Sequence, residues 1–300
     1  MTASHASRAT GAASIIAARL LAAGLLLAGM GWAAPARADC TPRIIRVAGI
    51  ERSGIVCASE ERRRPSPALL VFHGRGGSAR DMLDGAAFHR AWPEAVVVYL
   101  DGLPGSPSPY DPAGRRAGWQ LLPGEADDRD VAFADAVVAM LTGTAGVDPA
   151  RIYAAGHSNG ARFVGVLWAA RGERFRALAF SAAQAGELID QAPPRPVFMA
   201  MGVADRIVPF AMQQRSIGIA ARRFGIAGVD DATPGARTMA GRDGSELALL
   251  IHPGGHAWPH DQTRRMVAFF RRHDAAAIAA PAPSADAGKA GAAPLSPQQR

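Results

Sequence analysis

Short apolar runs alternate with longer helical patterns along most of the chain, and this alternation restricts the fold more than any other feature. Such a pattern is typical of a sheet flanked by helices. Because the apolar runs are almost continuously hydrophobic, they suit parallel strands buried on both faces. The sequence therefore predicts an α/β fold with a mainly parallel sheet and helices on both faces. The expected strands are 68–72, 95–100, 151–155, 177–181, 196–201 and 246–251, and the expected helices are 79–90, 127–142, 159–171, 210–224 and 261–273.

The first 38 residues have the features of a secretory signal peptide. Arg8 and Arg19 supply positive charge, and no acidic residue precedes Asp39. Residues 20–32 are apolar or glycine, a run shorter than the ~20 residues of a membrane span, and the small-residue motif Ala-Arg-Ala follows at 36–38. We expect cleavage after that motif, a secreted or periplasmic protein, and no stable membrane anchor afterwards. An uncleaved anchor is the alternative.

Both cysteines lie just after this segment. Asp39 stands directly before Cys40, where a lipoprotein signal needs a small residue, so a lipid anchor is rejected. Cys40 and Cys57 form no C-x-x-C motif and have no neighbouring histidine in the sequence, which argues against a metal site. In an oxidising compartment we expect them to form a disulfide with a structural role.

The charge of the chain argues against a nucleic-acid partner. The formal net charge of +7 falls to about +4 once the three arginines of the first 38 residues are removed. The only tight basic run is 62–64, and no basic stripe with interleaved aromatics is present.

The end of the chain, 274–300, is rich in alanine and proline with few large apolar residues. Such a segment buries too little surface to offset its ordering entropy, so we expect a disordered tail. The folded domain is then 40–273, without an internal repeat.

The pentapeptide Gly156-His157-Ser158-Asn159-Gly160 matches G-x-S-x-G between an expected strand and an expected helix. That context is the one a nucleophile elbow requires. Backbone approaches backbone in such a tight turn, so both outer positions must be glycine, and the Ser158 hydroxyl is exposed at the strand end. Without its context, the pentapeptide is only a glycine-rich turn.

Two further loops supply an acid and a base. Asp205 follows the strand 196–201, at the strand end where catalytic groups gather in α/β sheets, and His256 follows the last strand in a glycine-containing loop. The order Ser, Asp, His along the chain is the hydrolase order. A helix cap or surface turn is the alternative role for Asp205. His252 is a rival base, and the poorer acid candidates are Asp190, Asp230, Asp231 and Asp243.

A glycine-rich loop at 71–77, Val-Phe-His-Gly-Arg-Gly-Gly, ends an earlier strand. A loop of this kind supplies one backbone N–H of an oxyanion hole, and the residue after the nucleophile supplies the second. We assign the two donors to Arg75 and Asn159. A phosphate-binding loop is excluded because no G-x-x-x-x-G-K-[ST] pattern exists and the only lysine is Lys289.

Two connections differ sharply in length. The stretch 101–126 is long, rich in glycine and proline, and carries Tyr110 and Trp119, which indicates a functional loop. The connection 182–195 is short and leaves little room for a large lid. We expect Trp119 and Trp258 to line the acyl or alcohol pocket, although an isolated tryptophan more often packs in the core.

Over roughly 66–270 the chain resembles the polyhydroxybutyrate-depolymerase and feruloyl-esterase group of secreted α/β-hydrolases. The blocks that carry the resemblance are F-H-G-R-G-G-S, V-V-Y-L-D-G, G-W-Q, D-D-R-D-V-A-F, V-D-P-A-R-I-Y, G-H-S-N-G, G-V-A-D-R-I-V-P and G-G-H-A-W-P. The resemblance implies hydrolysis of carboxylic esters without a metal or organic cofactor. His157 and Arg75 depart from the family pattern, and no polymer-binding module follows the catalytic domain.

These observations predict a serine esterase that acts by two-step acyl transfer. The substrate classes that the resemblance implies are hydroxybutyrate oligomers or polyester, and feruloyl or acetyl sugar esters. Two alternatives stay open: a peptidase of the same fold, and a non-catalytic secreted binding protein on a hydrolase scaffold.

Overall fold

The structure, a computed structural model, describes residues 38–60 and 62–278. The expected signal peptide therefore lies, apart from Ala38, outside the described residues, and so does the expected tail from residue 279 onward. Among the described helices, none is long and apolar enough to cross a membrane.

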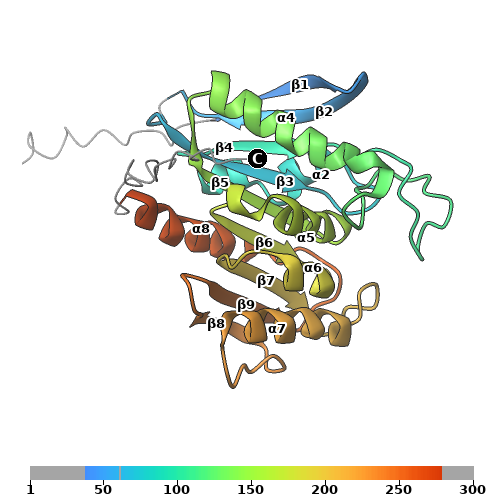
Figure 1. Cartoon of the computed structure of the whole chain (residues 1–300), viewed down its shortest axis with the longest axis vertical. Helices are drawn as coiled ribbons and strands as arrows, with labels where there is room; N and C mark the ends of the chain where they lie inside the picture. The colour runs from blue at the N-terminus through green and yellow to red at the C-terminus, as the bar shows by residue number, and fades with distance from the viewer. Residues whose placement is uncertain (1–37, 61, 279–300) are drawn as a thin grey trace, which may run out of the picture. The chain divides into compact units, whose positions relative to one another are not determined.

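The described residues form a sheet of nine strands in the order β1-β2-β4-β3-β5-β6-β7-β9-β8 (Figure 1). The six central strands, from β4 to β9 in that order, are parallel to one another and are the six that the sequence predicted. The strands are β1 (Asp39–Val47), β2 (Ile50–Ala58), β3 (Ser66–Phe72), β4 (Val96–Leu100), β5 (Val147–His157), β6 (Ala177–Ser181), β7 (Val197–Gly202), β8 (Gly235–Ala240) and β9 (Glu246–His252).

Three antiparallel strands at the sheet edges were not predicted. β1 pairs only with β2, and β8 pairs only with β9 within the described sheet. Both edge strands are largely exposed and mix polar with apolar residues, so they lack the continuous hydrophobicity that marked the central strands. In the first hairpin, Cys40 lies opposite Cys57 and a disulfide joins the two residues.

Helices cover both faces of the sheet. They are α2 (Ala79–Gly85), α3 (Phe88–Ala91), α4 (Arg129–Thr144), α5 (Asn159–Arg171), α6 (Gly186–Gln191), α7 (Phe210–Phe224) and α8 (Gln262–Ile278), with short 3₁₀ turns η1 (Glu125–Asp128) and η2 (Gly172–Arg174). The expected helix 79–90 is divided in two, since Ala87 adopts a left-handed conformation (φ 47°) between α2 and α3. The short connection after β6 holds only α6 and no large lid.

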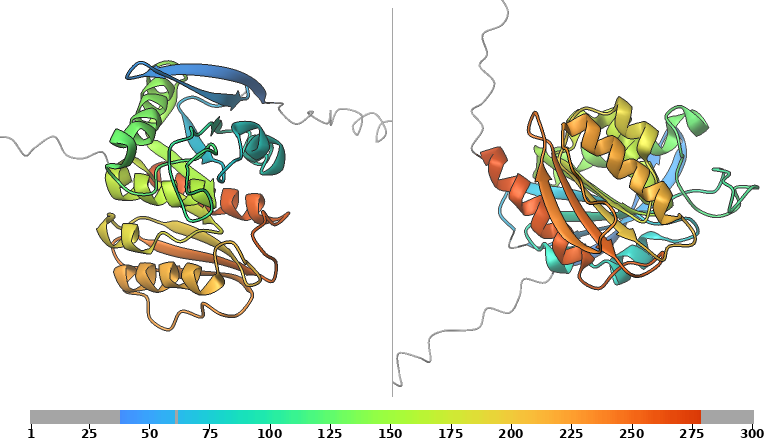
Figure 2. Two further views of the ribbon diagram at one scale, coloured as in Figure 1. Left: turned by 90° about the vertical axis from the view of Figure 1, so that its right-hand side faces the viewer. Right: turned by 90° about the horizontal axis from the view of Figure 1, so that it is seen from below.

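Successive side chains of the buried strands point to opposite faces of the sheet and so contribute to two separate hydrophobic cores. In β3, Leu70 and Phe72 face the core shared with α4, α5, α6 and α7, whereas Leu69 and Val71 face the core shared with α2, α3 and α8. Figure 2 shows α7 and α8 on opposite sides of the sheet. Every side chain of β3 is buried, and residues 68–72 of the strand are all apolar, as expected for a central parallel strand.

The folded domain extends past the predicted end at residue 273. α8 continues to Ile278, and the Asp274 carboxylate accepts hydrogen bonds from Arg151 at 2.5 and 2.7 Å and from the Tyr153 hydroxyl at 3.0 Å. Asp274, where we expect the tail to begin, therefore lies within α8 and has partners on β5.

Candidate active site

Ser158 occupies a strained turn between β5 and α5. Its φ is 53° and its ψ is −120°, a conformation that L-residues rarely adopt and that concentrates at functional sites. A Cβ on Gly156 would lie 2.4 Å from the carbonyl carbon of Gly160, and one on Gly160 would lie 2.3 Å from the carbonyl oxygen of Phe72. The requirement for glycine at both positions, predicted from the sequence, is confirmed.

The side chains of Ser158, His256 and Asp205 touch in series. Ser158 Oγ lies 2.8 Å from His256 Nε2, and His256 Nδ1 lies 2.8 Å from Asp205 Oδ2. The three residues follow β5, β9 and β7, whose carboxyl ends meet at one edge of the parallel sheet. A carboxylate on Nδ1 places the imidazole proton there and leaves Nε2 free to accept the serine proton.

The Asp205 carboxylate is held by four donors. Oδ1 accepts the backbone N–H groups of Ile207 and Val208 at 2.8 and 2.9 Å, and Oδ2 accepts Nε2 of Gln213 at 3.0 Å as well as His256. Gln213 belongs to α7 and is fully buried. Sequence reasoning missed this residue, because a single glutamine in a helical pattern carries no signal of its contact.

The two residues predicted to supply the oxyanion donors line the pocket beside Ser158. Arg75 and Asn159 both line it, and a Cβ on Gly74 would lie 3.4 Å from the Ser158 Cβ, so the glycine-rich loop lies against the nucleophile. Neither backbone N–H has an acceptor in the described part of the chain. Two such donors converging beside a serine hydroxyl can stabilise an alkoxide oxygen.

His73 holds the glycine-rich loop in place. Its Nε2 accepts the Gly102 N–H at 2.9 Å, so its Nδ1 carries the proton and donates to the Gly74 carbonyl at 2.7 Å. Burial lowers the pKa of His73, which keeps the ring neutral in this role. The sequence marked this histidine only as part of the glycine-rich motif.

A second histidine adjoins the His256 ring. The centroids of His157 and His256 are 5.0 Å apart, and His157 Nδ1 lies 3.2 Å from Ser181 Oγ. Burial, reinforced by repulsion from His256, lowers the pKa of His157 to about 4. His157 is therefore neutral at neutral pH and leaves His256 without a competing positive charge.

The two predicted pocket tryptophans do not line the pocket. Trp119 is fully buried, stacks on Phe163 at 5.3 Å, and donates its indole N–H to the His73 carbonyl at 3.0 Å. Trp258 is half-buried, packs edge-on against Phe88 at the border of the core next to α3, and donates its indole N–H to the Thr263 hydroxyl. Each indole has an internal acceptor and an apolar surface to cover, so each packs inward.

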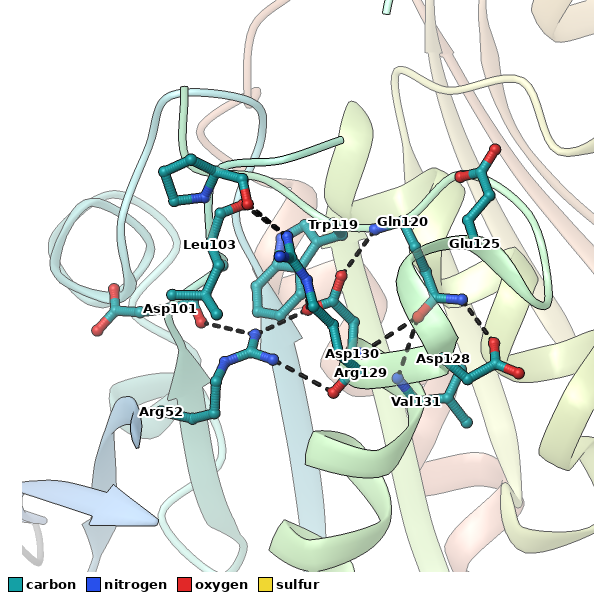
Figure 3. A network of polar contacts seen from close by, with 12 residues as sticks. Arg52, Asp101, Leu103, Trp119, Gln120, Glu125, Asp128, Arg129, Asp130 and Val131 are labelled. Atoms are coloured by element: carbon teal, nitrogen blue, oxygen red, sulfur yellow. Dashed lines mark hydrogen bonds and ion pairs between the residues drawn. The ribbon is translucent and has the colours of Figure 1, made fainter. Parts of the chain in front are cut away.

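A buried polar network anchors both ends of the long loop before α4 (Figure 3). Arg52 of β2 forms an ion pair with Asp130 at 2.8 Å, with both side chains at most 1% exposed, and also donates to the Asp101 carbonyl at the start of the loop. At the loop end, Asp130 Oδ2 accepts the Gln120 N–H at 2.8 Å, and the Gln120 side chain donates to Asp128 at 2.7 Å. The intervening segment, 105–118, is left to form a wall of the pocket.

The pocket over Ser158 has a volume of about 810 Å³. Tyr110 spans it by donating to the Ile207 carbonyl at 2.5 Å, which links the long loop to the loop of Asp205. Sequence reasoning missed most of the residues that line the pocket, since they come from several separate loops and from the helices α5, α6 and α7. Other lining residues are Leu121, Leu122, Ala183, Val208 and Met212, with Arg116, Glu125, Arg162 and Glu187 as charged groups.

One described group has the spacing of metal ligands, namely Cys40, Cys57 and His89, whose ligand atoms lie within 4.8 Å of one another. The two sulfurs are joined in the disulfide and so offer no thiolate. His89 Nδ1 is already engaged with the Tyr99 hydroxyl at 3.0 Å. This donor set does not fit a metal ion.

Strand order, the elbow after β5 and the positions of the acid and base loops define the α/β-hydrolase fold. Solved structures of that fold superpose on the chain: a ferulic acid esterase (TM-score 0.57, 12% identity, 79% of this chain and 98% of the other), an S-formylglutathione hydrolase of Agrobacterium tumefaciens (0.56, 13%, 81% and 98%) and an acetyl xylan esterase of Aspergillus awamori (0.53, 13%, 76% and 98%). At these identities the likeness establishes the fold alone.

The sequence itself has a nearer relative. It is 30% identical over 271 residues to a protein of Nocardia uniformis subsp. tsuyamanensis named "Putative esterase NocK", and the match covers 75% of each chain. The chain belongs to the same family as that protein. No protein-family profile matches the sequence.

Proposed function

We propose that this protein is a serine esterase that hydrolyses carboxylic esters through an acyl-enzyme. The observation that carries the proposal is the unbroken series of contacts from Ser158 Oγ through His256 to Asp205, next to two unpaired backbone N–H groups. The esterase name of the related NocK supports the same reaction.

In the first step His256 removes the Ser158 proton while Oγ attacks the ester carbonyl carbon. The carbonyl oxygen becomes an oxyanion, which the N–H groups of Arg75 and Asn159 stabilise by about 3 kcal/mol each in the transition state. Asp205 keeps the imidazole in its reactive tautomer and stabilises the imidazolium. His256 then protonates the leaving alcohol, and the acyl group stays on Ser158.

In the second step water enters where the alcohol left. His256 removes a proton from the water, the hydroxide attacks the acyl carbon, and Ser158 leaves with the proton from His256. The products are one carboxylic acid and one alcohol, so a single water is consumed. No metal or organic cofactor takes part in any step of this proposal.

A 4-nitrophenyl ester assay with the Ser158→Ala variant tests the reaction. We expect the variant to lose about 10³-fold or more of kcat, because the nucleophile is absent. A fluorophosphonate should also add its mass to the wild type at Ser158 alone, and an unchanged melting temperature shows that the variant is folded. Equal turnover by wild type and variant would contradict the proposal and leave the alternative of a non-catalytic binding protein.

The substrate class is a finer proposal. The apolar pocket of about 810 Å³, without a large lid, suits hydroxybutyrate oligomers or feruloyl and acetyl sugar esters. The panel that discriminates them contains methyl ferulate, acetylated xylan, a hydroxybutyrate trimer and a peptide amide. Fastest turnover of the amide would instead favour a peptidase of the same fold.

We also propose that the protein is exported with cleavage after Ala38. The charge and apolar pattern of the first 38 residues supports export, and the disulfide at Cys40 suits an oxidising compartment. The N-terminal sequence of protein recovered outside the cytoplasm should begin at Asp39. Recovery of the full-length chain from the membrane fraction would instead indicate an uncleaved anchor.

A further inference from the structure

One wall of the pocket carries polar groups that the proposed reaction does not use. Arg75, Ser108 and Arg116 line it, and we call these three residues the cationic wall. They come from the glycine-rich loop and from the middle of the long loop. The wall adjoins the oxyanion donors because Arg75 belongs to both.

The guanidinium of Arg75 is nine-tenths buried and incompletely paired. Nη1 donates to the Ser106 carbonyl at 2.6 Å and reaches Asp111 Oδ2 only at 3.5 Å. That same carboxylate oxygen also accepts the Arg116 N–H at 3.0 Å. Nη2 of Arg75 has no acceptor among the described residues. A buried cationic donor without an acceptor is costly unless a ligand or water completes it.

Arg116 is the second cation of the wall. Its side chain lies over the oxyanion loop, since its Cδ is 3.4 Å from the place that a Cβ on Gly76 would occupy. Arg116 is exposed, lines the pocket, and forms no ion pair with a carboxylate among the described residues. Ser108 Oγ is buried and also has no partner in that part of the chain. The wall thus carries two cations, of which Arg75 is paired with Asp111 and Arg116 has no carboxylate partner among the described residues.

The other charged groups of the pocket already have partners. Arg162 and Glu187 form an ion pair at 2.5 Å. Glu125 accepts the backbone N–H groups of Leu121 and Leu122 at 2.7 and 3.1 Å, so its charge is stabilised at the opposite end of the loop. Arg116 is therefore the one pocket-lining arginine of the described chain that has no carboxylate partner.

We propose that the cationic wall binds a carboxylate of the substrate, and that the enzyme prefers esters that carry a free carboxylate a few bonds from the bond it cleaves. Arg116 contacts that carboxylate, and the charge of Arg75 and the buried Ser108 hydroxyl lie behind it. A short oligoester of a hydroxy acid, with a free acid at its end, has this chemistry. The inference rests on the proposed esterase function and names the substrate class of the same site.

Two matched substrate pairs test the preference. In the first, the carboxylate lies on the acyl side: mono-4-nitrophenyl glutarate is compared with 4-nitrophenyl glutaramate, in which an amide replaces the carboxylate. In the second, it lies on the alcohol side: 3-acetoxybutanoate is compared with 3-acetoxybutanamide. We expect kcat/KM to favour the acid about tenfold in one pair, because a charge-assisted hydrogen bond replaces a neutral one.

Three variants test whether the preference for the acid depends on the cationic wall. Arg116→Gln should lower the acid-to-amide ratio of kcat/KM toward one, and Arg116→Glu should bring it below one. Arg115→Gln is the matched control, since Arg115 is also exposed but does not line the pocket, and it should keep the wild-type ratio.

Equal turnover of acid and amide in both pairs by the wild type would overturn the preference while the esterase proposal stands. A ratio lowered as much by Arg115→Gln as by Arg116→Gln would overturn the assignment to the wall. If the esterase proposal itself were wrong, a different result would be seen. None of the four substrates, nor a plain 4-nitrophenyl ester, would then show turnover that depends on Ser158.

Discussion

The carboxamide of Asn159 forms two hydrogen bonds with the backbone of Trp119. The Trp119 N–H donates to Oδ1 at 2.8 Å, and Nδ2 donates to the Trp119 carbonyl at 3.1 Å. The residue directly after the nucleophile thus has two contacts of different kinds. Its backbone N–H faces the pocket, and its side chain fixes the long loop whose middle forms the pocket wall. The oxyanion donor and the wall are positioned by the same residue.

Replacement of Asn159 by Ala removes both hydrogen bonds but keeps the backbone N–H. We expect a stability loss of about 1–3 kcal/mol, since the buried N–H and C=O of Trp119 lose their partners. KM should rise for bulky esters because the wall is no longer fixed. Urea unfolding and steady-state kinetics measure the two effects. Unchanged stability and KM would show that the loop is held without this contact.

Replacement of Gln213 by Leu removes the side-chain donor to Asp205. We expect kcat to fall by about tenfold or more with little change in KM, because a group that orients a catalytic residue acts in the transition state. Gln214→Leu is the matched control, as its side chain donates to the Asp231 carbonyl away from the site. Equal kinetics for the two variants would contradict a positioning role for Gln213.

Stability should depend on pH through His157. Its folded pKa is about 4 against 6.5 for a free histidine, so between these values the unfolded chain binds more protons than the folded one. The stabilising contribution is complete above about pH 6.5 and is lost as the pH falls toward 4. His157→Gln should therefore flatten the decline of melting temperature across this window, whereas replacement of the exposed His260 by Gln should leave it steep. Buried His73 keeps a residual slope in both variants, since burial lowers its pKa too.

The disulfide should stabilise the first hairpin. Cys40 and Cys57 are 17 residues apart, and a cross-link over such an interval contributes about 3 kcal/mol by restricting the unfolded chain. We expect the double variant Cys40→Ser/Cys57→Ser to lose about that much unfolding free energy in urea. A reducing agent should destabilise the wild type similarly and leave the variant unaffected. Equal sensitivity of both proteins to the reductant would contradict the assignment.

The Arg52–Asp130 pair should be sensitive to removal of one partner. Asp130→Asn leaves a buried guanidinium without its counter-charge, which costs about 3–5 kcal/mol. The surface pair of Arg80 and Asp84, whose side chains are 71% and 57% exposed, serves as the control. Asp84→Asn should cost less than about 1 kcal/mol. Comparable losses for the two variants in urea unfolding would show that the network of Figure 3 does not anchor the loop.

The sequence determined by itself those features that depend on local chemistry. Continuous apolar runs predicted the six central strands, since a strand buried on both faces has no polar position. The requirement for glycine at 156 and 160 followed from the tightness of one turn. Ser158, Asp205 and His256 could be proposed because parallel strands bring their following loops to one edge, and the structure places these three side chains in contact.

The tertiary structure alone decided the features that depend on which side chains come into contact in the fold. The sequence left both the pocket and the core open to Trp119 and Trp258, and only the tertiary structure shows that each indole N–H has an internal acceptor and that neither residue lines the pocket. Gln213 and Arg116 carry no local pattern that sets them apart from other polar residues. Their significance arises from their neighbours in the fold: Gln213 donates to the Asp205 carboxylate, and Arg116 lines the pocket without a carboxylate partner among the described residues. Contacts of this kind are fixed by packing across the sheet, and no short stretch of sequence encodes them.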